Sequence, residues 1–78
     1  MSETVCIDVK AAIEAALPDA TAQVRGGGGH YEIVVTSASF EGKPTVDKQR
    51  IVYRAIKHLM AGDEAPVHAV DRLECRVP

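Results

Sequence analysis

Two histidines, His30 and His68, are the side chains of this sequence whose type and position could do chemistry. Each stands at the start of a segment that we predict to be a β-strand, and a glycine run at positions 26–29 comes directly before His30. If the two strands run parallel, their starts meet at one edge of the sheet. Imidazole nitrogens bind borderline metals, but two nitrogens fill only half of a tetrahedral site. The sequence therefore indicates either two ordinary exposed histidines or half of a metal or cluster site, which thiolates of a second molecule would complete.

The glycine run fits none of the phosphate-binding loops that glycines often signal. A P-loop needs Lys and then Ser or Thr after its last glycine, and a dinucleotide-binding loop opens a helix. Here His30 and Tyr31 open a predicted strand instead. The G-x-x-G loop of KH domains joins two helices, whereas this run joins two strands. We therefore interpret the run as a hairpin loop.

The sequence shows no constellation typical of an enzyme. Ser37 and Ser39 lie near no obvious base, and no pair of carboxylates stands out. A chain of 78 residues also has little room for a closed pocket. We therefore predict a non-enzymatic domain, and we expect His58, on the flank of a predicted helix, to lie at the surface.

Apolar residues at helical spacing predict two helices, over residues 8–17 and 45–60. Asp8 and Thr45 are the predicted N-caps of these helices. Residues 1–7 are expected either to fray or to add a turn. The helices must position the strands, because each has one apolar side that needs a sheet to cover it.

Alternating apolar residues predict strands over residues 21–25, 30–37 and 67–77, the last with Val70 on its outer face. The strand–helix–strand unit in the second half of the chain predicts a parallel pair, and the hairpin adds an antiparallel strand. The predicted fold is one α+β domain over residues 1–78, in which helices pack on one face of a three-stranded mixed sheet.

The composition agrees with a small domain that has an aliphatic core. The chain is 46% hydrophobic but only 4% aromatic, so we expect the core to consist of Val, Ile, Leu and Ala. No apolar run approaches the roughly 20 residues of a membrane-spanning helix, and no secretory signal is visible. Cys6 and Cys75 do not form a metal-type pair, and they indicate reduced thiols in a cytoplasmic protein.

The net charge of −2 argues against strong nonspecific binding of nucleic acid, but the charge is unevenly distributed. The segment over residues 40–60 holds five basic side chains against two acidic ones. This pattern indicates either a solvated helix face or a surface for an anionic partner. The five basic side chains are Lys43, Lys48, Arg50, Arg54 and Lys57.

Several segments, taken together in their order and spacing, resemble the BolA family. The resemblance covers about residues 8–75 and is closest to the short bacterial type often called IbaG or YrbA. The segments that carry it are His30-Tyr31-Glu32-Ile33, Ser37, Phe40-x-Gly42-Lys43, Val46, Arg50, Val52-Tyr53 and Val67-His68-Ala69-Val70.

The resemblance implies a variant of the type II KH-like topology, α-β-β-α-α-β, with a small middle helix at about residues 45–49. It also implies a non-enzymatic partner of monothiol glutaredoxins that shares or transfers a [2Fe-2S] cluster in iron homeostasis and stress response. The histidine of the family's His-Ala-Val/Leu motif is its cluster ligand, and His68 matches it. The family's second ligand is a Cys or His in the first hairpin loop, where this chain has only glycine, so His30 is the residue that can stand in.

A second function that the resemblance implies is transcriptional regulation by binding DNA. The phosphate contacts would then come from the basic side chains of residues 40–60. The net acidity of the chain and the lack of an aromatic stacking platform count against this alternative. For the isolated chain we expect a monomer or a weak homodimer.

Overall fold

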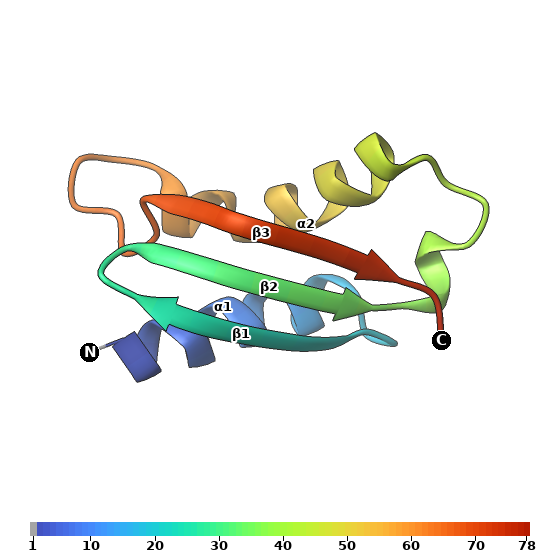
Figure 1. The fold of residues 1–78 in the computed structure, drawn as a ribbon, viewed down its shortest axis with the longest axis horizontal. Helices are drawn as coiled ribbons and strands as arrows, with labels where there is room; N and C mark the ends of the chain where they lie inside the picture. Colours follow the sequence, from blue (N-terminus) through green and yellow to red (C-terminus); the bar gives the residue numbers. More distant parts are fainter. Residues whose placement is uncertain (1) are drawn as a thin grey trace.

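The computed structural model describes residues 2–78, which form a three-stranded sheet with two helices behind it (Figure 1). The chain begins with one helix, continues through a hairpin and a short 3₁₀ helix into the second helix, and ends with the third strand. The elements are α1 (Ser2–Ala16), β1 (Thr21–Gly27), β2 (His30–Thr36), the 3₁₀ helix η1 (Ala38–Phe40), α2 (Thr45–Met60) and β3 (Ala69–Arg76).

The sheet has the order β1-β2-β3. Strand β2 is antiparallel to β1 and parallel to β3. Helix α2 makes the long connection that a parallel pair requires. Both helices lie on the same face of the sheet, and the other face is open (Figure 1). The structure thus confirms the predicted fold class, an α+β domain with a three-stranded mixed sheet.

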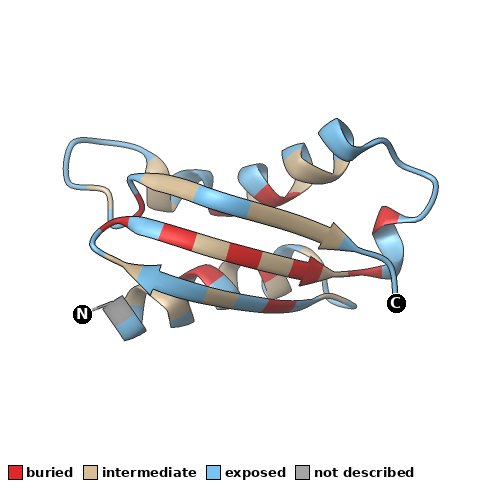
Figure 2. Cartoon of the chain, in the orientation of Figure 1, coloured by how far each residue is buried: buried red, intermediate tan, exposed pale blue. Residues whose placement is uncertain are grey.

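The core lies between β2 and the two helices. Tyr31, Ile33 and Val35 alternate along β2 and are buried, as the buried segments of this strand in Figure 2 show. They pack with side chains from α1, α2 and the connecting segments. The prediction of a purely aliphatic core is wrong, because the core also contains two aromatic rings, those of Tyr31 and Phe40. The other buried apolar residues are Val9, Ile13, Ala22, Val52, Ile56 and Val67.

Helix α1 is longer than predicted. It begins at Ser2, so Asp8 lies inside the helix and is not its N-cap, and the described residues before it are helical and not frayed. The apolar spacing of the helix continues backwards to Val5, which packs against the core next to Val9. Met1 lies outside the described residues.

Helix α2 has the predicted bounds, but two details of its start differ. Pro44 occupies the N-cap position without a side-chain hydrogen bond, and Thr45 is the first helical residue. The extra helical turn expected at residues 45–49 is absent there, because α2 is continuous from Thr45. A short helical turn precedes it instead, the 3₁₀ helix η1.

A buried serine and an exposed aspartate hold the corner after β2. The Ser37 hydroxyl donates to both carboxylate oxygens of Asp19, at 3.1 and 3.0 Å, and accepts the Ser39 N–H as the cap of η1. The Ala38 N–H also donates to Asp19, at 2.9 Å. Asp19 comes from the turn between α1 and β1, so this cluster ties two distant turns together. Sequence reasoning did not predict it.

The outer edge of β1 is covered at one point by side chains of α1. The Ala22 N–H donates to the Glu14 carboxylate at 3.0 Å, and Lys10 Nζ donates to the Ala22 carbonyl at 2.8 Å. Lys10 and Glu14 also pair with each other one helical turn apart. The pair therefore satisfies groups that an edge strand would otherwise offer to another chain.

Among the described residues, no helix combines the length and the apolar character needed to cross a membrane.

Candidate functional site

The glycine run forms a tighter turn than the sequence suggested. Gly27 pairs directly with His30, so β1 extends two residues further than predicted and only Gly28 and Gly29 form the turn. Both have positive φ, +62° and +86°, as a two-residue type I′ hairpin requires. Gly26 is also required, because a Cβ at this position would stand 2.3 Å from the His30 carbonyl oxygen. The run is thus a fixed hairpin end and not an open loop.

The turn anchors the residue that precedes β3. The backbone N–H groups of His68 and Ala69 both donate to the Gly29 carbonyl, at 2.8 and 3.0 Å. Before them, Val67 is buried and its N–H donates to the Leu59 carbonyl. His68 therefore sits on a backbone that is held on both sides, although its side chain is exposed.

The His68 imidazole packs directly on Gly29. A Cβ at Gly29 would stand 2.4 Å from His68 Cδ2 and 2.9 Å from Cγ. Only glycine leaves room for the ring at this place, since real Cβ atoms do not approach so closely. This contact brings together His68, the hairpin turn and the start of β2, as the sequence predicted for the two histidines.

The second histidine, His30, has a carboxylate partner. His30 Nδ1 lies 3.0 Å from Asp71 Oδ1, and both side chains are exposed. The parallel ladder is irregular here: Tyr31 pairs with Val70 and Glu32 with Arg72, so Asp71 has no partner opposite it. This bulge also corrects the prediction for Val70, which packs against the core and does not face outward.

Sequence reasoning missed Asp71, although a signal was present. Val70 and Leu73 both pack against the core, but they are three residues apart. A regular strand places same-face residues two or four apart. Two core-facing residues that stand three positions apart in a strand therefore indicate an extra residue between them.

The described residues do not complete a metal site by themselves. No group of three or more His, Cys, Asp or Glu side chains within residues 2–78 is placed to hold a metal ion. The two thiols of the chain are both free and half-buried. Burial raises the pKa of the Cys75 thiol, against a smaller opposing effect of the Lys48 charge. Such a protonated thiol is a poor nucleophile and a poor metal ligand.

The basic side chains of residues 40–60 do not form a single cluster. Lys43, Arg50 and Arg54 line one shallow depression of about 250 Å³, together with Asp47. Arg50 pairs with Asp47 at 3.9 Å, which reduces the positive charge there. Lys57, one turn beyond Arg54, is exposed on α2.

Lys48 is the exception among these basic side chains. It is half-buried and acts electrostatically on Cys75 in β3. Its place on the apolar side of α2 separates it from the depression. His58 is exposed on the last turn of the helix, as predicted.

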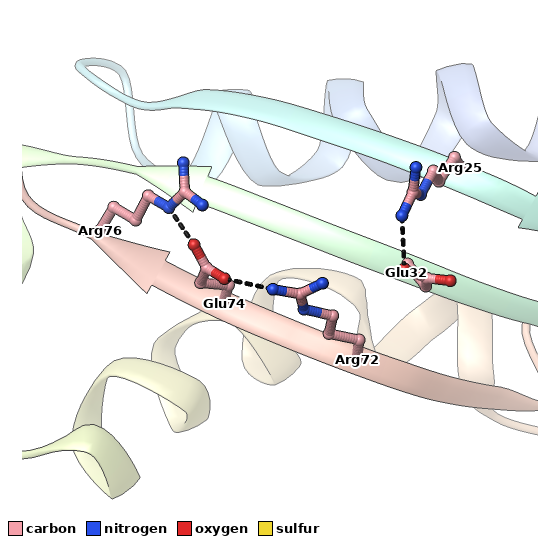
Figure 3. A network of polar contacts seen from close by, with 5 residues as sticks. All are labelled: Arg25, Glu32, Arg72, Glu74 and Arg76. Carbon is pink, nitrogen blue, oxygen red and sulfur yellow. Dashed lines mark hydrogen bonds and ion pairs between the residues drawn. The ribbon is translucent and has the colours of Figure 1, made fainter.

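The open face of the sheet carries three arginines and two glutamates that pair with one another (Figure 3). Arg25 on β1 pairs with Glu32 on β2 at 3.0 Å. Arg72 and Arg76 on β3 both pair with Glu74 between them, and Arg76, then Arg72, lower the pKa of its carboxyl. A shallow open depression of about 240 Å³ lies over this face. Since each carboxylate is paired with arginine, the face resembles a solvated surface more than a catalytic one.

The buried serine Ser37 has a structural role. Ser37 is fully buried, and its hydroxyl donates directly to the Asp19 carboxylate, without a histidine between the two groups. The hydroxyl therefore stabilises a turn and is not presented to a substrate.

These features define a small α+β domain in which two exposed histidines, His30 and His68, lie beside a tight glycine turn. The family model described as BolA-like protein matches residues 9–76. The chain belongs to the BolA-like protein family.

Relatives agree with this assignment. A protein of Acinetobacter guillouiae described as an uncharacterized protein in the rpoN-murA intergenic region is 38% identical over 58 residues, which are 74% of this chain and 68% of that protein. A BolA protein homologue from Coxiella burnetii is 33% identical with a TM-score of 0.77, over 92% of this chain and 88% of that one. BolA1 from Mus musculus is 30% identical with a TM-score of 0.75, over 95% of this chain and 65% of that one.

Proposed function

We propose that this BolA-like protein binds a monothiol glutaredoxin and supplies histidine ligands to a [2Fe-2S] cluster that the two proteins share. The observation that carries the proposal is the setting of His68. Its imidazole is exposed, and its backbone is fixed to the Gly29 carbonyl on one side and to buried Val67 on the other. A ligand that a partner must find at a surface needs this combination of accessibility and fixed position.

The two histidines would supply half of the ligands of such a cluster. Histidine pairs ligate one iron of some [2Fe-2S] centres, with thiolates on the other. Within residues 2–78 the candidates are the imidazoles of His68 and His30, and no third donor joins them. The remaining ligands would therefore come from thiolates of the partner. When bound, the cluster supplies the redox and transfer chemistry. The chain itself would position the His68 imidazole, which packs on Gly29 of the turn.

The test is to mix the chain with a monothiol glutaredoxin that carries its [2Fe-2S] cluster and to record visible absorption and circular dichroism. We expect the wild-type chain to change the spectrum and His68→Ala to abolish most of that change. His58→Ala is the matched control, because it removes an exposed imidazole from α2 and leaves the hairpin edge intact. An unchanged spectrum with the wild-type chain, together with no heat of binding in titration calorimetry, would refute the proposal.

A second candidate function is the binding of DNA, which the basic depression on α2 favours. Lys43, Arg50 and Arg54 line it, and phosphate binding by such side chains falls steeply with salt. Arg54→Ala should then weaken binding and flatten the salt dependence, whereas Lys48→Ala should not, because Lys48 lies elsewhere on the helix. No binding at low salt, measured by fluorescence anisotropy with a duplex, would remove this candidate.

A further inference from the structure

The bulge in β3 contains one residue that pairs with no residue of β2. Between the pairs Tyr31–Val70 and Glu32–Arg72, the extra residue is Asp71. A bulge bends its strand and re-aims a side chain, and bulges occur often beside functional sites. Here the re-aimed carboxylate reaches the imidazole of His30 in the neighbouring strand.

The contact favours one of the two neutral tautomers of His30. An ionised carboxylate can only accept hydrogen bonds. Asp71 Oδ1 lies 3.0 Å from His30 Nδ1, and this contact is a hydrogen bond to the carboxylate only when Nδ1 carries the proton. In the neutral ring the other nitrogen, Nε2, then has the free lone pair. The side chain of His30 is 61% exposed, so this nitrogen is accessible to a partner.

The same arrangement orients histidines that bind metals. A ligating imidazole almost always donates its second N–H to a carboxylate or carbonyl, which fixes the ring and raises its basicity. In this chain the arrangement exists before any metal is bound.

We infer that Asp71 is a positioning residue that makes His30, through Nε2, the second cluster ligand of this chain. The inference rests on the proposed function and adds to it the side chain that orients His30. Asp71 itself would not touch the cluster, and its effect would pass through His30.

The first test needs neither cluster nor partner. Long-range ¹H–¹⁵N correlation spectra of the isolated chain report the tautomer of each imidazole. At about pH 8.5, well above the ordinary histidine pKa, we expect His30 of the wild-type chain to be in the Nδ1–H form. Asp71→Ala should shift His30 toward the Nε2–H form and leave His58 unchanged. An Nε2–H tautomer for His30 in the wild-type chain would overturn the inference.

The second test is a double-mutant cycle on the mixed complex with a glutaredoxin. We expect Asp71→Ala to speed the loss of the cluster by about 10-fold, the lower end of the effect of such carboxylates on metal affinity. His30→Ala should do at least as much. In the double variant, Asp71→Ala should add nothing to His30→Ala, because the two act as one unit. Asp63→Ala is the control for the loss of one negative charge, since Asp63 is exposed in the α2–β3 connection.

The outcomes separate the inference from the function on which it rests. If Asp71→Ala speeds cluster loss equally with and without His30, Asp71 acts by another route and the inference fails. If His30→Ala has no effect while His68→Ala does, the inference fails and the proposed function stands. If neither histidine affects the cluster, the proposed function fails as well.

Discussion

Gly29 and His68 are in such close contact that the glycine determines where the imidazole lies. A Cβ at Gly29 would stand 2.4 Å from His68 Cδ2, and the Gly29 carbonyl accepts the His68 N–H at 2.8 Å. The turn therefore acts on the histidine through both its side chain and its backbone.

Replacing Gly29 by alanine should move the His68 ring. The neighbouring Gly28 provides a matched control, because it also has a positive φ but no atom within 4 Å of an added Cβ. Gly28→Ala and Gly29→Ala should each lose about 1–2 kcal/mol of unfolding free energy from backbone strain. Only Gly29→Ala should also shift the His68 ring signals in NMR spectra. Equal ring shifts in the two variants would contradict the contact.

The Ser37–Asp19 corner should make stability depend on pH. The hydrogen bond from Ser37 is the largest effect that lowers the pKa of the Asp19 carboxyl. A lowered folded-state pKa contributes stability that is fully present above the ordinary value of about 3.9 and is lost as the pH falls through the lowered value. Asp19→Asn should therefore be less stable than the wild type at pH 7, and the difference should disappear in strong acid.

The measurement for this corner is urea unfolding of both chains between about pH 2 and 7. A stability difference that stays constant with pH would show that the charge of Asp19 is not involved. Ser37→Ala provides a check from the other side of the contact. It should lose about 1 kcal/mol, as expected when a helix cap is removed.

The cover over β1 predicts a local change in hydrogen exchange. The Ala22 N–H donates to Glu14 and not to a neighbouring strand. Glu14→Ala should therefore speed exchange of the Ala22 amide, while the amide of Gln23, which pairs with Val34 across the ladder, keeps its protection. Unchanged exchange at Ala22 would mean that the hydrogen bond to Glu14 does not persist in solution.

The sequence predicted most of the fold because its elements have clear periodicity. The pattern of β2, with Tyr31, Ile33 and Val35 on one face, and that of α2 gave these elements nearly their observed bounds. The start of α1 is not predicted correctly, because Asp8 is of a residue type that often caps helices but here lies inside the helix, while Val5 continues the apolar spacing before it.

The sequence predicted the edge of the sheet at which the two candidate histidines lie, but not the contacts that support them. The start of β2 was predicted at His30 and that of β3 two residues too early, at Val67 instead of Ala69. This was close enough to predict the edge that His30 and His68 share. The Asp71 contact depends on a bulge and the Gly29 contact on a turn of two residues. The bulge depends on the pairing of β2 with β3, which are distant in sequence, and the turn depends on the register of the β1–β2 hairpin. Local patterns report neither directly.

Deleting Asp71 should separate the role of the bulge in folding from its role at the site. Without this residue, Val70, Arg72 and Leu73 follow one another with regular alternation, and each keeps its present partner in β2. The ladder would lose only an unpaired residue, so we expect the unfolding free energy to change by no more than about 1 kcal/mol. His30 would lose its carboxylate, and its tautomer should shift as in Asp71→Ala.

Unfolding in urea and the imidazole NMR spectrum check the two halves of this prediction. A large loss of stability would show that the bulge is needed to bend β3 over the core, since a bulge also increases strand twist. A stable deletion variant with a shifted tautomer would show that the extra residue is retained for its carboxylate and not for the sheet.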